Sequence, residues 1–326
     1  MTVLRQHVKK AALAVAIGAA SCAAQANLVT SIKPLGFIAS SIADGVTDVE
    51  IIVPPGASPH DYNLKPSDVQ KVKSADLILW IGEDIDGFLD NSIDDIERKK
   101  AITIADLADV EPLLSKPDHD HDHDHNHKEE HKDEHKHDHK DNHGHEHHNH
   151  AHDDLSVNWH IWYSPQIGKI VAQKVADKLA QQYPAKQDLI AQNLENFNRT
   201  LALQSDKIKS QLAPFATKGF YVFHDAYGYF NDAYGLKQTG YFTINPLVAP
   251  GAKTLATIKQ EIAEHKVSCL FAEPQFTPKV IETLSKGTGV HIGRLDPMGD
   301  KVALGKNAYA DFLQFTADSY AECLSK

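Results

Sequence analysis

The most regular hydrophobic pattern in the chain lies between residues 185 and 212. The stretch contains neither glycine nor proline, and Pro184 and Pro214 stand just outside its ends. The apolar positions recur at helical spacing: Ile190, Leu194, Phe197, Leu201, Ile208 and Leu212. This spacing predicts one amphipathic helix about 40 Å long. Because strand and helix patterns alternate on both sides of it, we interpret the helix as a connector between two lobes; an ordinary helix inside one domain is the alternative.

Short apolar runs alternate with helical patterns before this helix. Strands are predicted at 28–32, 49–53, 77–81 and 101–104, and helices at 35–43, 66–74 and 165–183. The run at 49–53 is almost continuously apolar, which is typical of a parallel strand buried on both faces. The first half is therefore predicted to be a βαβ succession around a parallel sheet.

The same alternation returns after the long helix. Strands are predicted at 219–223, 241–244, 267–271 and 290–295, and helices at 226–234, 254–265, 278–286 and 308–324. The expected fold class is thus α/β, with two similar βα lobes joined by a single long helix. The predicted boundaries are 27–184 for the N-terminal lobe, 185–212 for the connector and 213–326 for the C-terminal lobe.

The first 26 residues differ from the rest of the chain. Basic residues at positions 5, 9 and 10 precede an apolar run at 11–20, and Ala24-Gln25-Ala26 offers a small-x-small cleavage site. This pattern is typical of a cleavable secretory signal peptide, and the run is too short to cross a bilayer. We expect an exported, soluble mature protein. Lipid attachment at Cys22 is the alternative, although Ala19-Ala20-Ser21 matches a lipoprotein box poorly.

Residues 118–153 contain almost only His, Asp, Glu, Lys and Asn. Fifteen of the 21 histidines lie between His119 and His152. Such a segment cannot bury a core, so we expect a disordered surface loop. Its imidazoles are suited to weak, interchangeable zinc sites, and a merely solubilising insertion is the alternative.

The mature chain is acidic and retains two cysteines. Its formal net charge moves from −11 to −14 when the three basic residues of the signal are removed, so nucleic acid is not an expected partner. The remaining cysteines are Cys269 and Cys323. An even pair in an exported protein predicts a disulfide, and two free buried thiols are the alternative.

Five histidines lie outside the signal and the histidine-rich loop: His60, His160, His224, His265 and His291. His60 follows the strand at 49–53 and His224 ends the strand at 219–223, while Asp296 follows the strand at 290–295. Ligands of open α/β sheets bind beyond the carboxyl ends of the strands, so His60 and His224 would face a crevice between opposed lobes. A structural role is the alternative for each histidine, and it is our interpretation of His265 and His291.

Several motifs carry a family resemblance. They are Pro55-Gly56-Ala57-Ser58-Pro59-His60-Asp61-Tyr62, Trp159-His160-Ile161-Trp162, Phe223-His224-Asp225-Ala226-Tyr227, Phe271-Ala272-Glu273-Pro274-Gln275-Phe276 and Leu295-Asp296-Pro297. In this order they resemble the metal-binding solute-binding proteins of ABC transporters, cluster A-I, over essentially the whole mature chain. With the His/Asp-rich insertion, the chain is most similar to the zinc-specific periplasmic members.

The resemblance implies two α/β lobes with a metal bound in the cleft between them. It implies His60, His160 and His224 as metal ligands, Asp296 as the fourth, and Asp84 or water as its alternative. Manganese-binding members place a carboxylate where this chain has His224, and three imidazoles suit zinc better. The two cysteines also match the positions of a disulfide in zinc-binding relatives.

The expected function is the capture of Zn²⁺ in the periplasm and its delivery, by a monomer, to an inner-membrane permease with a cytoplasmic ATPase. This function involves no catalysis. A zinc hydrolase is one alternative, because three protein ligands plus water is also a catalytic arrangement and Glu273 is a candidate base. The sequence contains no His-Glu-x-x-His motif. The other alternative function is a surface-exposed metal-binding adhesin, which fits some members of the family.

Overall fold

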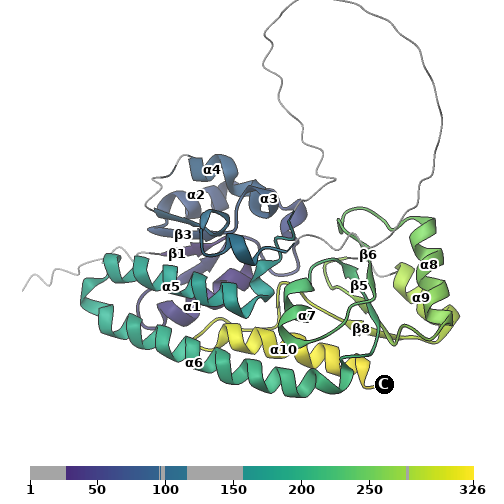
Figure 1. Cartoon of the computed structure of the whole chain (residues 1–326). Helices are drawn as coiled ribbons and strands as arrows, with labels where there is room; N and C mark the ends of the chain where they lie inside the picture. The colour runs from purple at the N-terminus through teal and green to yellow at the C-terminus, as the bar shows by residue number, and fades with distance from the viewer. Residues whose placement is uncertain (1–26, 95, 97–99, 116–156, 277–278) are drawn as a thin grey trace, which may run out of the picture.

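The computed structural model describes residues 27–94, 96, 100–115, 157–276 and 279–326 (Figure 1). The predicted signal peptide at 1–26 and the predicted histidine-rich loop at 118–153 lie outside these residues. Within the described ranges, no helix has the length and hydropathy that crossing a membrane requires.

Two four-stranded parallel sheets form the framework, one in each half of the chain. The first has the order β2-β1-β3-β4, with β1 (Leu28–Thr30), β2 (Val49–Ile51), β3 (Leu77–Trp80) and β4 (Ala101–Thr103). The second has the order β6-β5-β7-β8, with β5 (Phe220–His224), β6 (Gly240–Thr243), β7 (Cys269–Ala272) and β8 (His291–Arg294). The two orders are equivalent, which confirms the predicted α/β class with two similar βα halves. The predicted domain boundaries stay a prediction.

Helices connect and cover these strands. They are α1 (Lys33–Ala43), α2 (Pro66–Ser74), α3 (Glu83–Asp86), α4 (Asp90–Asp94), α5 (Pro165–Gln182), α6 (Gln187–Leu212), α7 (Gly228–Tyr234), α8 (Ala252–Ala263), α9 (Lys279–Thr288) and α10 (Ala308–Leu324). Local sequence explains where some of them begin. In α5, for example, Pro165 occupies the first turn, and the Ser164 hydroxyl accepts the Ile167 N–H at 3.2 Å.

The long predicted helix is α6. It runs along the lower side of the molecule in Figure 1 and packs against α1, α5, α7 and α10. A 3-10 turn at Pro184–Lys186 replaces the first residues of the prediction. Five of the six predicted core positions are buried, and Leu194 is half-buried. Asn193 is also buried on this helix, and its side-chain N–H groups donate to the Ile42 and Asp44 carbonyls, both at 2.9 Å, which satisfies carbonyls at the end of α1.

Helix α10 also joins the two halves. It packs against α6 and against α1 of the first half. Phe37 of α1 contacts Phe312 of α10 with ring centroids 5.1 Å apart, and the Tyr309 hydroxyl donates to the Trp162 carbonyl at 2.9 Å. The two sheets are therefore positioned by a shared group of packed helices in addition to the α6 connection.

A disulfide links Cys269 in β7 to Cys323 in α10, with Cα atoms 6.1 Å apart. It fastens the C-terminal helix to the second sheet. Gly293 on the neighbouring strand β8 leaves the necessary space, because a Cβ atom there would lie 2.8 Å from the Cβ of Cys323.

Candidate metal centre

His60 lies in the loop that follows β2. The loop closes with a 3-10 turn, Pro59–Asp61, in which the Ser58 hydroxyl accepts the His60 N–H at 3.3 Å. Gly56 has a φ of 79°, a left-handed conformation that favours glycine, and its N–H donates to the Asp300 carboxylate at 2.7 Å. The loop is thus held by its own turn and by a segment of the second half of the chain.

His160 is oriented by Asn158, two residues earlier. The Asn158 side-chain oxygen accepts the His160 backbone N–H at 3.1 Å and lies 2.8 Å from His160 Nδ1. The Asn158 N–H group donates to the Asp225 carbonyl at 2.9 Å, which fixes the amide orientation. Because an amide oxygen only accepts, Nδ1 of His160 carries the proton and its Nε2 presents a lone pair.

His224 is the last residue of β5 and is buried. Its Nδ1 lies 2.8 and 2.7 Å from the two carboxylate oxygens of Glu273, which itself is buried and accepts the Tyr227 hydroxyl at 3.1 Å. The carboxylate keeps the proton on Nδ1, so Nε2 of His224 also presents a lone pair. A carboxylate behind a histidine is the usual support of a metal-binding imidazole.

The three histidines converge on one point. Their ring centroids are 5.0 Å apart for His160 and His224, 5.5 Å for His60 and His160, and 5.6 Å for His60 and His224. One nitrogen of each ring lies within 4.8 Å of the others, and the Nε2 atoms of His160 and His224 are 3.1 Å apart. Tetrahedral zinc with Zn–N bonds of about 2.05 Å separates its nitrogens by about 3.3 Å, so the spacing suits this ion.

Burial keeps two of these imidazoles neutral. Desolvation by burial, with a smaller contribution from the nearby His224 ring, lowers the pKa of His60 to about 3. The pKa of His160 is also well below its usual value, first because of burial and then because of His224 and His60. A neutral imidazole is the form that binds metal, so neither side chain holds a competing proton near pH 7.

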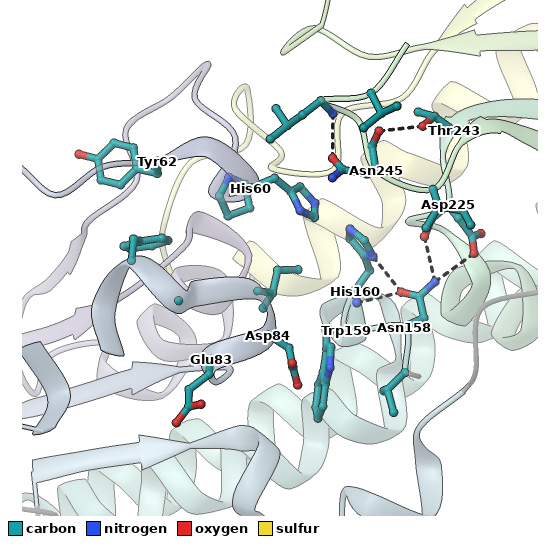
Figure 2. A pocket seen from close by; sticks show the side chains of 18 of the residues that line it. His60, Tyr62, Glu83, Asp84, Asn158, Trp159, His160, Asp225, Thr243 and Asn245 are labelled. Atoms are coloured by element: carbon teal, nitrogen blue, oxygen red, sulfur yellow. Dashed lines mark hydrogen bonds between the residues drawn. The ribbon is translucent and has the colours of Figure 1, made fainter. Parts of the chain in front are cut away.

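The structure does not bring the two candidate carboxylates into this cluster. Asp296 accepts hydrogen bonds from the Gln275 side chain at 3.0 Å, from the Met298 N–H at 3.1 Å and from the Asp300 N–H at 2.8 Å. These three bonds leave one lone pair of Oδ2 unused, but Asp296 is not among the described residues whose potential ligand atoms converge. Asp84, the alternative fourth ligand, is exposed on α3, and its carboxylate points away from the imidazoles in Figure 2.

Two cavities adjoin the histidines. A cavity of about 740 Å³ opens onto His60 and His160 and is lined on other sides by Phe88, Trp159 and Leu247 (Figure 2). A second cavity, of about 10 Å³, is bordered by all three histidines and by Gln275, Phe276 and Met298. The larger one provides access from solvent, and the smaller one has room for a single small ligand such as water.

Sequence reasoning found the converging histidines but missed the residues that orient them. Asn158 was not predicted, and Glu273 was considered only as a catalytic base. Glu273 carried a signal that could have been used: it follows β7, which neighbours β5 in the sheet, so its side chain lies at the same edge as His224. His265 and His291 are exposed and stand outside the cluster.

Comparison with known protein families identifies the family to which the chain belongs. The family model described as "Zinc-uptake complex component A periplasmic" matches residues 28–323. The chain belongs to the ZnuA family. It is 70% identical to the high-affinity zinc uptake system protein ZnuA of Haemophilus influenzae, over 99% of this chain and 100% of the relative. It is 50% identical to the Haemophilus ducreyi protein of the same name, over 98% and 99%.

The fold of the ZnuA family also recurs in more distant solved structures. The periplasmic zinc-binding protein TroA from Treponema pallidum superposes with a TM-score of 0.71 at 17% identity, over 93% of this chain and 100% of that chain. At this identity the similarity speaks to the fold alone. Together with the family match, it confirms the resemblance to cluster A-I solute-binding proteins.

Proposed function

We propose that this chain captures Zn²⁺ and delivers it to the permease of an ABC importer. The observation that carries the proposal is the convergence of three imidazoles, with the His160 and His224 Nε2 atoms 3.1 Å apart. Membership of the ZnuA family, whose model is described as a periplasmic component of a zinc-uptake complex, supports the transport role.

In this proposal His60, His160 and His224 bind the ion. An all-nitrogen donor set favours zinc over harder ions such as manganese, which prefer carboxylate oxygen. Affinity alone does not exclude Cu²⁺ or Ni²⁺, because imidazole sites follow the general affinity order of these ions. Selection of zinc therefore depends on metal availability as well as on geometry.

The proposed setting is the periplasm, with a soluble monomer that meets an inner-membrane permease and its cytoplasmic ATPase. Export by the predicted signal peptide supports this location. Zinc is cargo, and no chemistry on a second substrate is involved. The hydrolase alternative requires a free general base beside the ion, whereas both Glu273 oxygens contact His224 and one also accepts the Tyr227 hydroxyl. Within the residues that the structure describes, nothing favours the adhesin alternative over transport.

The test is zinc affinity, measured by competition with a strong chelator. A variant lacking residues 118–153 keeps predicted weak sites from masking the result. His224→Ala is expected to weaken binding by more than about 100-fold, beyond the 10- to 100-fold typical of losing a supporting residue. His291→Ala, a substitution of an exposed histidine outside the cluster, is the control and should bind normally. Wild-type affinity in His224→Ala would contradict the proposal.

A further inference from the structure

Gln275 contributes a polar side chain to the small cavity among the histidines. It lies just after β7, three residues beyond the end of the strand, and borders the 10 Å³ cavity together with His60, His160 and His224. Neighbouring Phe276 packs against His224 with ring centroids 6.1 Å apart. Sequence reasoning gave Gln275 no role, and it is not among the potential metal donors described above.

The orientation of the Gln275 amide is fixed from outside the cavity. Its Nε2 donates to the Asp296 carboxylate at 3.0 Å. Asp296 is held in turn by the Met298 and Asp300 N–H groups. A carboxylate accepts only, so the amide cannot exchange its nitrogen and oxygen without losing this bond. The amide nitrogen therefore makes the contact with Asp296, and the amide oxygen, Oε1, takes no part in it.

Oε1 of Gln275 is buried and accepts no hydrogen bond from any residue that the structure describes. Buried acceptors are nearly always paired, so an unpaired one beside a potential metal site indicates a missing donor. The nearby imidazoles of His160 and His224 do not provide it, because their protons are on Nδ1 and point to Asn158 and Glu273. The cavity that Gln275 borders with the three histidines is placed to hold such a donor.

We infer that Gln275 holds a water molecule that completes the zinc coordination of the three histidines. A water molecule bound to zinc donates an oxygen lone pair to the metal. Its O–H groups remain free to donate hydrogen bonds, which complements the unpaired carbonyl of Gln275. The cavity has room for a group of this size. Gln275 is thus a positioning residue for the fourth ligand, and the inference rests on the proposed zinc site.

This arrangement gives Asp296 an indirect role. Its carboxylate orients Gln275 by a hydrogen bond, and the neutral amide, not the carboxylate, borders the small cavity among the histidines. The immediate ligand set then contains three imidazoles and water, with no anionic oxygen. Such a set suits zinc better than manganese.

Gln275→Met tests the inference, since it removes the carbonyl and nearly preserves the volume. In the full mature protein, zinc affinity measured by chelator competition should fall 10- to 100-fold, as is typical when a supporting partner is lost. The visible absorption of the Co²⁺-loaded protein should also change, because its d–d bands respond to the fourth ligand. Gln260→Met, in which an exposed glutamine of α8 is replaced, is the matched control and should alter neither.

The outcomes separate this inference from the proposed function. If wild-type protein binds zinc tightly, His224→Ala does not, and Gln275→Met matches the wild type in both affinity and cobalt spectrum, the inference is wrong and the zinc site stands. If His224→Ala binds like the wild type, the zinc site itself is wrong. A zinc-loaded crystal structure should show water between zinc and Oε1, within about 3.2 Å of the oxygen. A direct zinc–Oε1 bond would overturn the water assignment.

Discussion

His224 is the residue at which a change of metal preference is most directly testable. A carboxylate in its place would supply the oxygen donor that manganese prefers. However, the His224 imidazole contacts the buried Glu273 carboxylate at 2.7 Å. The single substitution His224→Glu would therefore bring two carboxylates together in a desolvated site, which raises the pKa of one of them and favours its neutral form. The partner must be changed at the same time.

We predict that His224→Glu combined with Glu273→Gln raises the ratio of Mn²⁺ to Zn²⁺ affinity by at least about 10-fold over the wild type. Glutamine at position 273 removes the repulsion while keeping similar volume and a hydrogen-bonding group. Competition binding of both ions measures the ratio. Glu273→Gln alone is the control and should weaken zinc without favouring manganese. An unchanged ratio in the double variant would contradict the role proposed for His224.

At the scale of elements, α10 depends on a covalent bond to the sheet it covers. The disulfide between Cys269 and Cys323 spans a sequence separation of 54 residues. Closing a loop of this length lowers the entropy of the unfolded chain and corresponds to about 4 kcal/mol in the chain-entropy model. The bond therefore contributes to the position of a helix that also contacts the first half of the protein.

The corresponding prediction is that Cys269→Ala with Cys323→Ala lowers the free energy of unfolding of the zinc-free protein by about 4 kcal/mol. Denaturant unfolding followed by circular dichroism measures this value. A reducing agent should destabilise the wild type and leave the double variant unchanged. Two reactive thiols in the denatured, unreduced wild type would show that the bond is absent.

Elements with strong periodicity were predictable, and their ends were less so. The apolar stripe of α6 predicted its core positions, because apolar side chains at helical spacing lie on one face and are buried together. The true start of α6 at Gln187 depends on a 3-10 turn that periodicity does not report. Asn193 is polar and would be expected on the exposed face of α6. It is buried because two carbonyls near the end of α1 accept its N–H groups. Such long-range polar pairing leaves no local signal in the sequence.

For the whole molecule, the lowered histidine pKa values predict a pH-dependent stability of the zinc-free state. An unfolded histidine titrates near 6.5, whereas His60 in the folded protein has a pKa of about 3. Between these values the unfolded chain binds a proton that the folded chain does not. His60 therefore stabilises the fold fully above pH 6.5, and this contribution is lost as the pH falls, by up to about 1.4 kcal/mol per pH unit.

The measurement is the unfolding free energy from pH 7 to pH 4.5 for the wild type and for His60→Gln, both without metal. Asp86 acts in the opposite direction, because burial raises its pKa to about 6, so the difference between the two proteins is the informative quantity. The advantage of the wild type should shrink as the pH falls. Parallel curves would show that His60 is not held neutral.

The convergence of the three histidines was predictable, whereas the residues that orient them were not. His60 and His224 follow strands of two separate sheets, and the rule that ligands bind beyond the carboxyl ends of strands placed both at one crevice. Their role as metal ligands, together with His160, was implied by the family resemblance and stays a prediction. The contact between Gln275 and Asp296 depends on how two loops of the second half approach each other. No spacing in the sequence encodes that approach.

Because the proposed ligands come from both halves of the chain, zinc retention would depend on the distance between the halves. His60 and His160 come from the first half and His224 from the second, so a small separation of the halves lengthens the bonds on one side before the other. A tetrahedral ion tolerates little elongation of bonds near 2 Å. A receptor that moved the halves apart would therefore weaken zinc binding by distance alone, without protonating an imidazole.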